Sequence, residues 1–165
     1  IPLIERLSDS NPELRIMFTV SPIRHLRDGA HENQLSKSVL LLFVDELCRM
    51  YPDRCIYFPS YEIVMDELRD YRFYDAGMTH PNEQAIRYIW ERFSEACFSE
   101  ETQTLNREWE RLEKALNHRP LTPDKDAFRD FTMQNLFKLK KIWEKYSYFD
   151  LSKEIDSLEL FLKTL

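Results

Sequence analysis

The order of three segments in the first third of the chain restricts the folds that it can adopt. Two short apolar runs, residues 14–20 and 55–58, flank a longer segment in which apolar residues recur at helical spacing. The length of the runs and the prolines that follow them are typical of buried strands. Because parallel strands need a long crossover between them, the sequence predicts one right-handed βαβ unit.

The helix between the two runs is expected to begin at Gln34 and to end before Pro52. Its expected apolar stripe consists of Leu35, Val39, Leu42, Phe43, Leu47 and Met50. Residues 61–68 predict a short helix, and an aromatic-rich loop follows. A longer helix is expected to start at Pro81, because proline is tolerated at the first helical position, where its missing N–H would lack a partner anyway.

The last third of the chain is predicted to be helical. Ser99 can cap a helix whose first turn carries Glu100 and Glu101, and two further amphipathic segments follow. The sequence thus predicts an α/β part at residues 1–98 and a tail of about three helices at residues 99–165. The final seam consists of Leu151, Ile155, Leu158, Leu162 and Leu165. It can bind a partner or a second copy, or pack within the chain, which we favour.

Composition argues against several classes of function. A net charge of −6 disfavours nucleic acid or an anionic membrane surface as a partner, because both repel an acidic protein. Gly29 and Gly77 are the only glycines, so the chain has no glycine-rich loop for a phosphate or a dinucleotide. No run of about 18 apolar residues is present. We therefore expect no cofactor, no nucleic acid partner and no membrane span.

The cysteines give an expectation about location. Cys48, Cys55 and Cys97 form no C-x-x-C pair, so neither a disulfide framework nor a structural zinc site is expected. Reduced thiols and the lack of a signal-peptide pattern predict a cytoplasmic protein. The first residue is Ile1 and not methionine, and we expect the chain to belong to a longer polypeptide.

Among the four histidines, His80 is the best candidate for chemistry. It lies in a loop before a helix, and α/β proteins place their sites on loops at the ends of buried strands. A helix N-terminus disfavours positive charge, which would keep the imidazole neutral and able to accept a proton. A general base also needs an orienting carboxylate, and Asp70 and Asp75 lie on the same loop. The alternative is that His80 only caps the helix.

The other candidates have structural interpretations that we favour. His25 and His31 share a loop with acidic residues, but their H-x5-H spacing matches no metal site, so we expect a surface loop and no metal. His118 lies in a turn between helices. Ser21 follows a strand, as a nucleophile would, but lacks the small neighbours of a G-x-S-x-G elbow. We expect its side chain to hydrogen-bond the backbone.

Several stretches together resemble a known family. Three of them are Phe18-Thr-Val-Ser-Pro-Ile-Arg-His25, Asp28-Gly-Ala-His-Glu-Asn-Gln-Leu-Ser-Lys-Ser38 and Tyr57-Phe-Pro-Ser-Tyr-Glu-Ile-Val-Met-Asp-Glu-Leu-Arg-Asp-Tyr71. A fourth, at residues 74–93, ends in Tyr88-Ile-Trp-Glu-Arg-Phe93. In this order they resemble the GSCFA-domain family, known mainly from bacteria, which is similar to the SGNH hydrolases. The resemblance covers residues 12–93.

The resemblance implies a three-layer α/β fold with a parallel sheet, of which this chain would hold a few strands, followed by the helical tail. It also implies a serine nucleophile in a Gly-Ser-Cys-Phe-Ala motif, which this sequence lacks. The expected function is part of an SGNH-like serine esterase, or of an acyl-ester hydrolase or transferase, acting on a small-molecule or glycan acyl ester. The nucleophile would come from upstream residues, and the chain alone would be inactive.

His80 falls at the position of the family's general base. SGNH enzymes carry an aspartate three residues before this histidine, where the sequence has Gly77, so Asp75 becomes the candidate acid. Ser21 and Asn33 fall on signature positions. Asn33 could donate to an oxyanion, although we favour it as the N-cap of the helix that follows. Gly77 also keeps a second class open: a non-catalytic α/β interaction module with a partner-binding or dimerising helical tail.

Overall fold

The computed structural model describes residues 2–117 and 125–164. The chain divides into two compact units, Ile1–Cys97 and Phe98–Leu165. His118 and Leu165, for which the sequence made predictions, lie outside the described residues. In the described residues, most of the chain is helical, and the first unit contains one small sheet.

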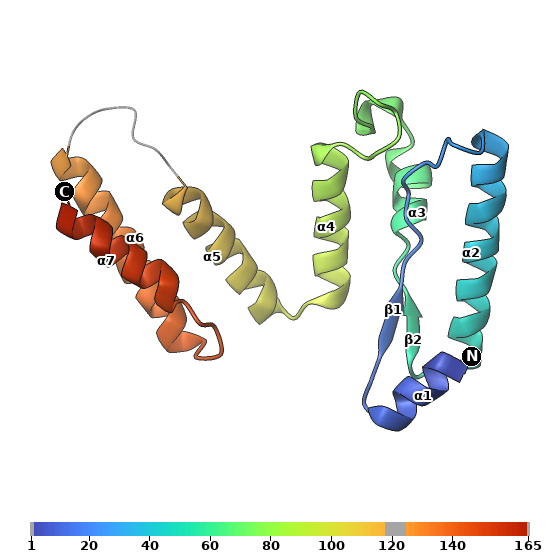
Figure 1. Cartoon of the computed structure of the whole chain (residues 1–165), viewed down its shortest axis with the longest axis horizontal. Helices are drawn as coiled ribbons and strands as arrows, with labels where there is room; N and C mark the ends of the chain where they lie inside the picture. The colour runs from blue at the N-terminus through green and yellow to red at the C-terminus, as the bar shows by residue number, and fades with distance from the viewer. Residues whose placement is uncertain (1, 118–124, 165) are drawn as a thin grey trace. The chain divides into compact units, whose positions relative to one another are not determined.

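The first unit contains the predicted strand–helix–strand order (Figure 1). Strands β1 (Ile16–Phe18) and β2 (Cys55–Tyr57) are parallel neighbours, with Ile16 opposite Cys55. Helix α2 (Ala30–Met50) returns the chain between them, as parallel strands require. Each strand has three residues and is thus shorter than the apolar run that predicted it. The α/β class is confirmed, with a two-stranded sheet in the described residues.

Two apolar clusters hold helices against this sheet. The first, to which α1 (Pro2–Ser10) contributes, has the buried residues Ile4, Leu47 and Cys55. The second has the buried residues Val20, Val44 and Tyr61. The second cluster lies just beyond the end of β1 and therefore fixes the start of the loop that follows this strand.

Helix α2 begins at Ala30, earlier than the predicted start at Gln34. Gly29 is its N-cap and has a φ of 95°, in the left-handed region that glycine adopts without steric cost. Asn33 therefore lies inside the helix, and the prediction that it forms the N-cap is wrong.

The buried face of α2 also differs from the predicted stripe. Its buried residues are Lys37, Val44 and Leu47, of which only Leu47 belonged to that stripe. The other predicted positions are exposed, with Leu42 reaching 71%. We call the exposed residues Leu35, Val39, Leu42 and Phe43 the open face of α2.

The chain after β2 forms one continuous helical stretch. Helix α3 (Ser60–Glu62) runs directly into a π-helical segment, η1 (Ile63–Leu68), so the short helix predicted at residues 61–68 is confirmed. Arg69 ends it in the left-handed conformation, with a φ of 38°. A short 3-10 turn, η2 (Tyr71–Phe73), then leads into the loop that carries His80.

Helix α4 (Glu83–Cys97) does not start at Pro81. The side chain of Asn82 caps it, because its Oδ1 accepts a hydrogen bond from the Ala85 N–H at 3.0 Å. Pro81 instead pairs with Tyr74 in an isolated antiparallel bridge. The predicted start at Pro81 and the alternative in which His80 caps this helix are therefore both wrong.

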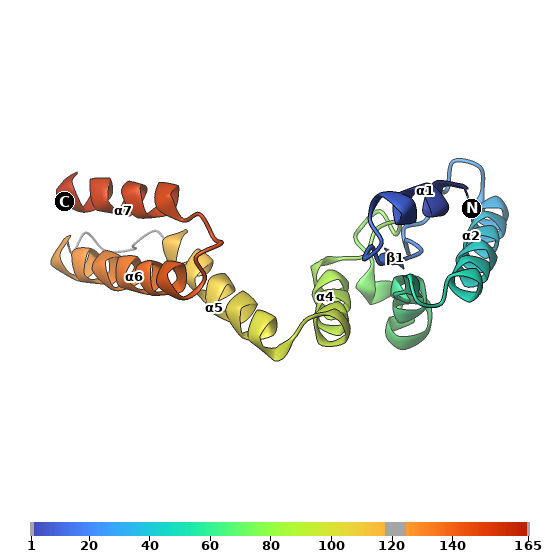
Figure 2. The ribbon, with the colours of Figure 1, turned by 90° about the horizontal axis from the view of Figure 1, so that it is seen from below.

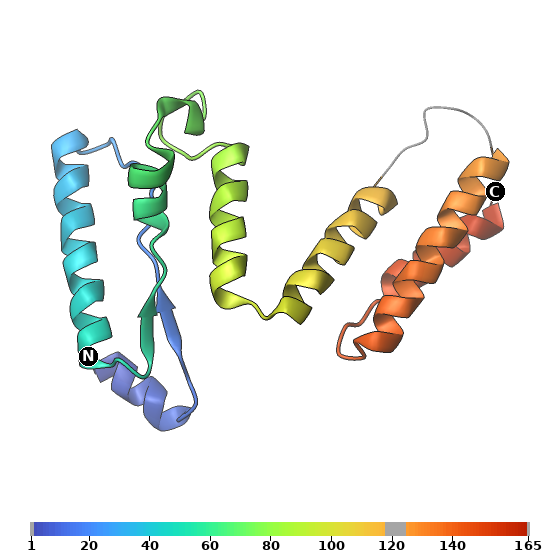
Figure 3. The same cartoon turned by 180° about the vertical axis from the view of Figure 1, so that it is seen from behind.

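In the described residues of the second unit, three helices are present: α5 (Glu100–Leu116), α6 (Lys125–Lys145) and α7 (Ser152–Thr164). Ser99 caps α5 as predicted, since its Oγ accepts a hydrogen bond from the Thr102 N–H at 3.2 Å. Helices α6 and α7 lie side by side in Figures 2 and 3. The short segment between them makes this pair antiparallel.

One apolar cluster forms the core of the second unit. Its buried residues are Leu105, Leu112, Leu139, Ile142, Tyr146, Leu151 and Ile155, and Leu158 packs against them. The final seam therefore packs within the chain, as favoured. The buried residues of α6 are Thr132, Asn135, Leu139 and Ile142, and Trp143 of the same helix is exposed.

The three cysteines are not in disulfide bonds, and Cys55 is buried. Burial raises the pKa of the Cys48 and Cys55 thiols, so both remain protonated at neutral pH. None of the described helices combines the length and the apolar character needed to cross a membrane.

Candidate functional site

His80 lies in a tight loop that its own backbone closes. The Asp75 N–H donates to the His80 carbonyl at 2.9 Å, directly inside the bridge between Tyr74 and Pro81. The Met78 N–H donates to the Asp75 carbonyl at 3.0 Å, and Met78 has a φ of 57°. This left-handed backbone conformation, which is uncommon for methionine, reverses the chain and brings Asp75 and His80 together.

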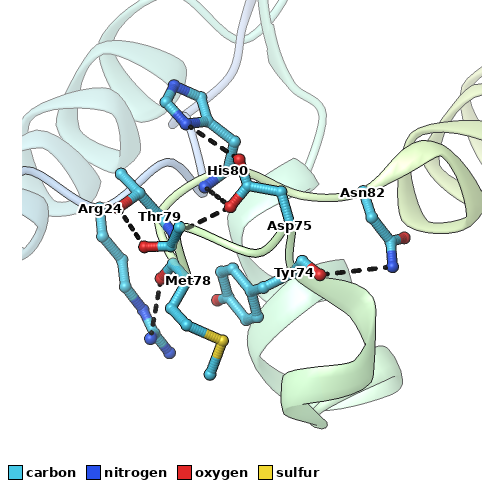
Figure 4. A network of polar contacts seen from close by, with 8 residues as sticks. Arg24, Tyr74, Asp75, Met78, Thr79, His80 and Asn82 are labelled. Atoms are coloured by element: carbon cyan, nitrogen blue, oxygen red, sulfur yellow. Dashed lines mark hydrogen bonds and ion pairs between the residues drawn. The ribbon is translucent and has the colours of Figure 1, made fainter.

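The Asp75 carboxylate serves both the loop backbone and the imidazole (Figure 4). Its Oδ1 lies 3.4 Å from the backbone N–H groups of Thr79 and His80, both of which donate to it. Its Oδ2 lies 3.7 Å from His80 Nδ1, which is longer than a hydrogen bond but within ion-pair range. The sequence predicted this pairing of acid and base, and the structure places the two side chains next to each other.

The lack of a side chain at Gly77 leaves room for the Asp75 carboxylate. A Cβ atom built at Gly77 would lie 3.4 Å from Asp75 Oδ1. The Asp75 carboxylate therefore occupies the space into which a side chain at position 77 would project. An acid five residues before the histidine thus reaches the region in which an acid three residues before it would lie.

Arg24 joins this loop to the one that follows β1. Its backbone N–H donates to the Thr79 carbonyl at 3.1 Å, and its Nη1 donates to the Met78 carbonyl at 3.3 Å. The guanidinium group also lies over the Tyr74 ring, 4.3 Å from its centroid. These contacts hold together two loops that are far apart in the sequence.

The site lies at the carboxyl ends of the parallel strands (Figure 1). The loop after β1 contacts the His80 loop through Arg24, and the segment after β2 leads into the same loop. The His80 side chain is 60% exposed, so an incoming group can reach it. This is the edge at which open parallel sheets place their ligands.

A buried lysine holds the loop after β1 at Ser21. Lys37 of α2 is 3% exposed, and its Nζ donates to the Ser21 carbonyl at 2.6 Å. Burial lowers the pKa of Lys37, because the ammonium form loses hydration there. The lysine thus anchors the start of the loop that carries Arg24.

Ser21 and Asn33 use their side chains to hold the same loop. Ser21 Oγ accepts a hydrogen bond from the Ile23 N–H at 3.3 Å, which confirms the expected contact with the backbone. Asn33 Oδ1 accepts one from the His25 N–H at 2.9 Å. Both contacts hold the loop backbone, and the possible role of Asn33 at an oxyanion stays a prediction.

Hydroxyl groups beneath the loop complete the polar surroundings. Ser60 Oγ donates to the Val20 carbonyl at 2.9 Å and also contacts Thr19 Oγ1. Tyr57 donates its hydroxyl proton to Glu62 at 2.8 Å, and burial together with this bond raises the pKa of Tyr57 far above its usual range. The tyrosine therefore remains a neutral donor at all ordinary pH values.

The structure also places the histidines that were considered as metal ligands. His25 and His31 are both exposed. In the part of the chain that the structure describes, no three His, Cys, Asp or Glu side chains gather where they could hold a metal ion.

Arg24 and Lys37 lie in the stretches that carry the family resemblance, but the sequence assigned neither of them a role. Arg24 gives no further signal, because it is a single cation in a loop without periodicity. Lys37 lies seven residues before Val44 and ten before Leu47, which is helical spacing for one face, but a lysine on such a face is usually assigned to the surface.

Two family descriptions match the chain. The GSCFA family matches residues 2–93, and the C-terminal domain of GSCFA domain proteins matches residues 109–164. The first match covers the α/β unit with the Asp–His pair, and the second covers most of the helical unit. The chain therefore belongs to the GSCFA family. Neither the curated proteins nor the solved structures gave a match.

Proposed function

We propose that this chain is part of an SGNH-like serine esterase, or of a related acyl-ester hydrolase or transferase, in which His80 is the general base. The observation that carries the proposal is the pairing of His80 Nδ1 with Asp75 Oδ2 at 3.7 Å on an exposed loop. A carboxylate at Nδ1 favours the tautomer that carries its proton there. That leaves Nε2 able to take a proton from a hydroxyl.

The proposed reaction needs a nucleophile that these 165 residues do not carry in the family motif. In the proposal, the serine of a Gly-Ser-Cys-Phe-Ala segment, upstream in the parent polypeptide, attacks the carbonyl of a small-molecule or glycan acyl ester. His80 accepts the serine proton and returns it to the leaving alcohol. Asp75 orients the ring and stabilises the imidazolium. The upstream segment would also supply the remaining strands of the parallel sheet in the three-layer α/β fold.

The test uses the polypeptide that contains both this chain and the Gly-Ser-Cys-Phe-Ala segment. A fluorophosphonate probe is expected to label its serine, and His80→Ala should reduce the labelling rate by at least about 10²-fold, because the serine then lacks its base. Asp75→Asn should reduce the rate as well, by up to about 10⁴-fold as in proteases whose histidine takes the wrong tautomer.

The matched control is His31→Ala, which removes another exposed imidazole of the same unit and should label at the wild-type rate. Labelling that persists in His80→Ala would remove His80 from the mechanism. Ester turnover by the 165-residue chain alone would contradict the proposed upstream nucleophile.

Gly77 favours a second candidate, a non-catalytic interaction module, because an acid at this position is the SGNH pattern. Its helical tail would bind a partner or a second copy. The buried positions of Leu151 and Ile155 make this final seam a poor contact surface. The module predicts no fluorophosphonate labelling of the parent, and it predicts a complex in light scattering. An unlabelled parent that forms such a complex would favour the module over the esterase.

A further inference from the structure

Two neighbouring hollows lie among the described residues of the second unit. The larger has a volume of about 360 Å³ and is lined by residues of α5 and α6. The smaller has a volume of about 250 Å³ and is lined by residues of α5, α6 and α7. Ala115 and Asn135 line both, so the two hollows meet at these residues. The larger is in the size range of small-molecule sites.

Asn135 is the unexplained group at this junction. It is 3% exposed, and its side-chain amide makes no hydrogen bond with any residue that the structure describes. The neighbouring buried Thr132, by comparison, donates its hydroxyl proton to the Phe128 carbonyl at 2.8 Å. The amide atoms of Asn135 are not among the fully buried polar atoms that lack a partner, so water in the hollows can reach them. A bound ligand could take the place of that water and accept a hydrogen bond from the amide.

The rim of the larger hollow is positively charged. Arg111, Lys138 and Lys141 line it together with one carboxylate, that of Glu108. Lys138 follows Asn135 by three residues on α6, so both lie on the same face of this helix. Lys141 also contacts the Phe137 ring, at 4.7 Å from the ring centroid. The excess of cations around a donor amide fits the head group of an anion.

The smaller hollow, in contrast, has aromatic walls. Phe128, Phe131 and Phe161 line it, with Phe128 and Phe161 edge to face at 5.5 Å between centroids. Leu158 adds a further apolar wall. Polarity therefore changes along the two hollows, from cationic side chains through the Asn135 amide to phenyl rings. An unbranched apolar chain would bury its surface against these rings.

We propose that the two hollows bind an amphipathic carboxylate of the medium-chain fatty acid class. The carboxylate lies in the larger hollow, where Asn135 Nδ2 donates a hydrogen bond to it and Lys138 and Arg111 neutralise its charge. The acyl chain extends past Ala115 into the smaller hollow. This site lies in the second unit and does not depend on the function proposed for His80.

Titration calorimetry of the full 165-residue chain with sodium decanoate tests the proposal. The wild type is expected to bind decanoate at one saturable site. Asn135→Leu keeps a similar side-chain volume without the amide and should weaken binding at least 10-fold. The matched control, Gln134→Leu, removes an amide from an exposed neighbour and should bind like the wild type.

Lys138→Gln supplies a test that does not depend on core packing, because Lys138 is exposed. It should weaken decanoate binding and make the affinity less dependent on salt. The uncharged analogue 1-decanol should bind more weakly than decanoate. The proposal is overturned by a wild type without saturable binding, as expected if water alone fills the hollows. It is equally overturned by wild-type affinity in both Asn135→Leu and Lys138→Gln, or by 1-decanol binding as tightly as decanoate.

Discussion

The two units bury their apolar residues to different extents. In the second unit, the seams of α5, α6 and α7 meet in one cluster around Leu139, whose fractional exposure is 0%. In the first unit, the open face of α2 stays exposed beside a sheet of two short strands. Antiparallel helices find partners among their neighbours in sequence, whereas parallel strands need partners from distant segments.

This difference suggests that the units derive their stability from different contacts. The second unit depends on the packing of the cluster around Leu139. The first depends more on hydrogen bonds that fix loops, such as those of Asn82, Lys37 and Arg24. Four predictions can break or sharpen this comparison.

The largest effect is expected from Leu139→Ala. Removing a fully buried leucine side chain should lower the free energy of unfolding of the second unit by about 2–5 kcal/mol, through lost burial and the cavity that remains. Leu42→Ala makes the same chemical change on the open face of α2 and should change the stability of the first unit by less than about 0.5 kcal/mol. Hydrogen exchange resolved by segment measures both.

Equal losses in Leu139→Ala and Leu42→Ala would break the comparison. They would mean that the open face of α2 is covered in solution. A loss confined to Leu139→Ala would support the different burial of the two units.

Helix caps give the next largest effect. Ser99→Ala should destabilise α5 by about 1 kcal/mol, the usual value of an N-cap. Asn82→Ala should cost about 2 kcal/mol, because Asn82 Nδ2 also donates to the Arg72 carbonyl at 2.6 Å and ties η2 to α4. Urea unfolding of each variant measures these costs. Asn82→Ser keeps the cap but loses the bond to the Arg72 carbonyl, so it should destabilise the protein less than Asn82→Ala does. A larger loss of stability in Asn82→Ser than in Asn82→Ala would contradict this account.

Lys37→Met tests the buried ammonium through pH. Burial lowers the pKa of Lys37 below 10.5 in the folded chain. Between the lowered pKa and 10.5, the unfolded chain binds a proton that the folded chain has released, so stability rises with pH in this window. The wild type should therefore gain stability relative to Lys37→Met as the pH approaches 10.5. Urea midpoints measured from neutral pH upward would contradict this if the two curves stayed parallel.

The smallest effect is expected for Glu159→Gln. Glu159 Oε1 accepts a hydrogen bond from Lys140 Nζ at 2.6 Å, and this bond lowers the pKa of Glu159 below 4.5. The contribution of the pair is therefore present above pH 4.5 and is lost as the pH falls through the lowered value. Thermal unfolding should show a slight decrease in Tm that vanishes near 1 M salt. A decrease that persists at high salt would argue against an ionic origin.

The sequence predicted the elements whose signals are local. Ser99 identified the start of α5, and the spacing of Leu151, Ile155 and Leu158 identified a seam that packs within the chain. The start of α2 was missed, because Gly29 forms its cap without a side-chain signal. The buried face of the same helix was also mispredicted, because it includes Lys37. The Lys37 ammonium is paired there with one carbonyl of a distant loop, which the sequence does not signal.

The candidate site could be predicted only in part. His80 and Asp75 were identified, but their approach depends on Met78 in a left-handed conformation, which a methionine does not signal.

The polar residues on the buried face of α6 were not predicted. The spacing of Thr132, Asn135 and Leu139 is that of a helix face. The first two are polar, however, and a search for apolar stripes passes over them.

The clamp formed by Arg24 bears on the order in which the molecule folds. Its guanidinium reaches the Met78 carbonyl across 54 positions of sequence, a span that contains α2 and the crossing between the strands. Closing a loop of this length costs chain entropy that nearby contacts must first offset. We therefore expect the loop that carries His80 to assemble last, after the crossover has formed, and to open first when the protein is heated.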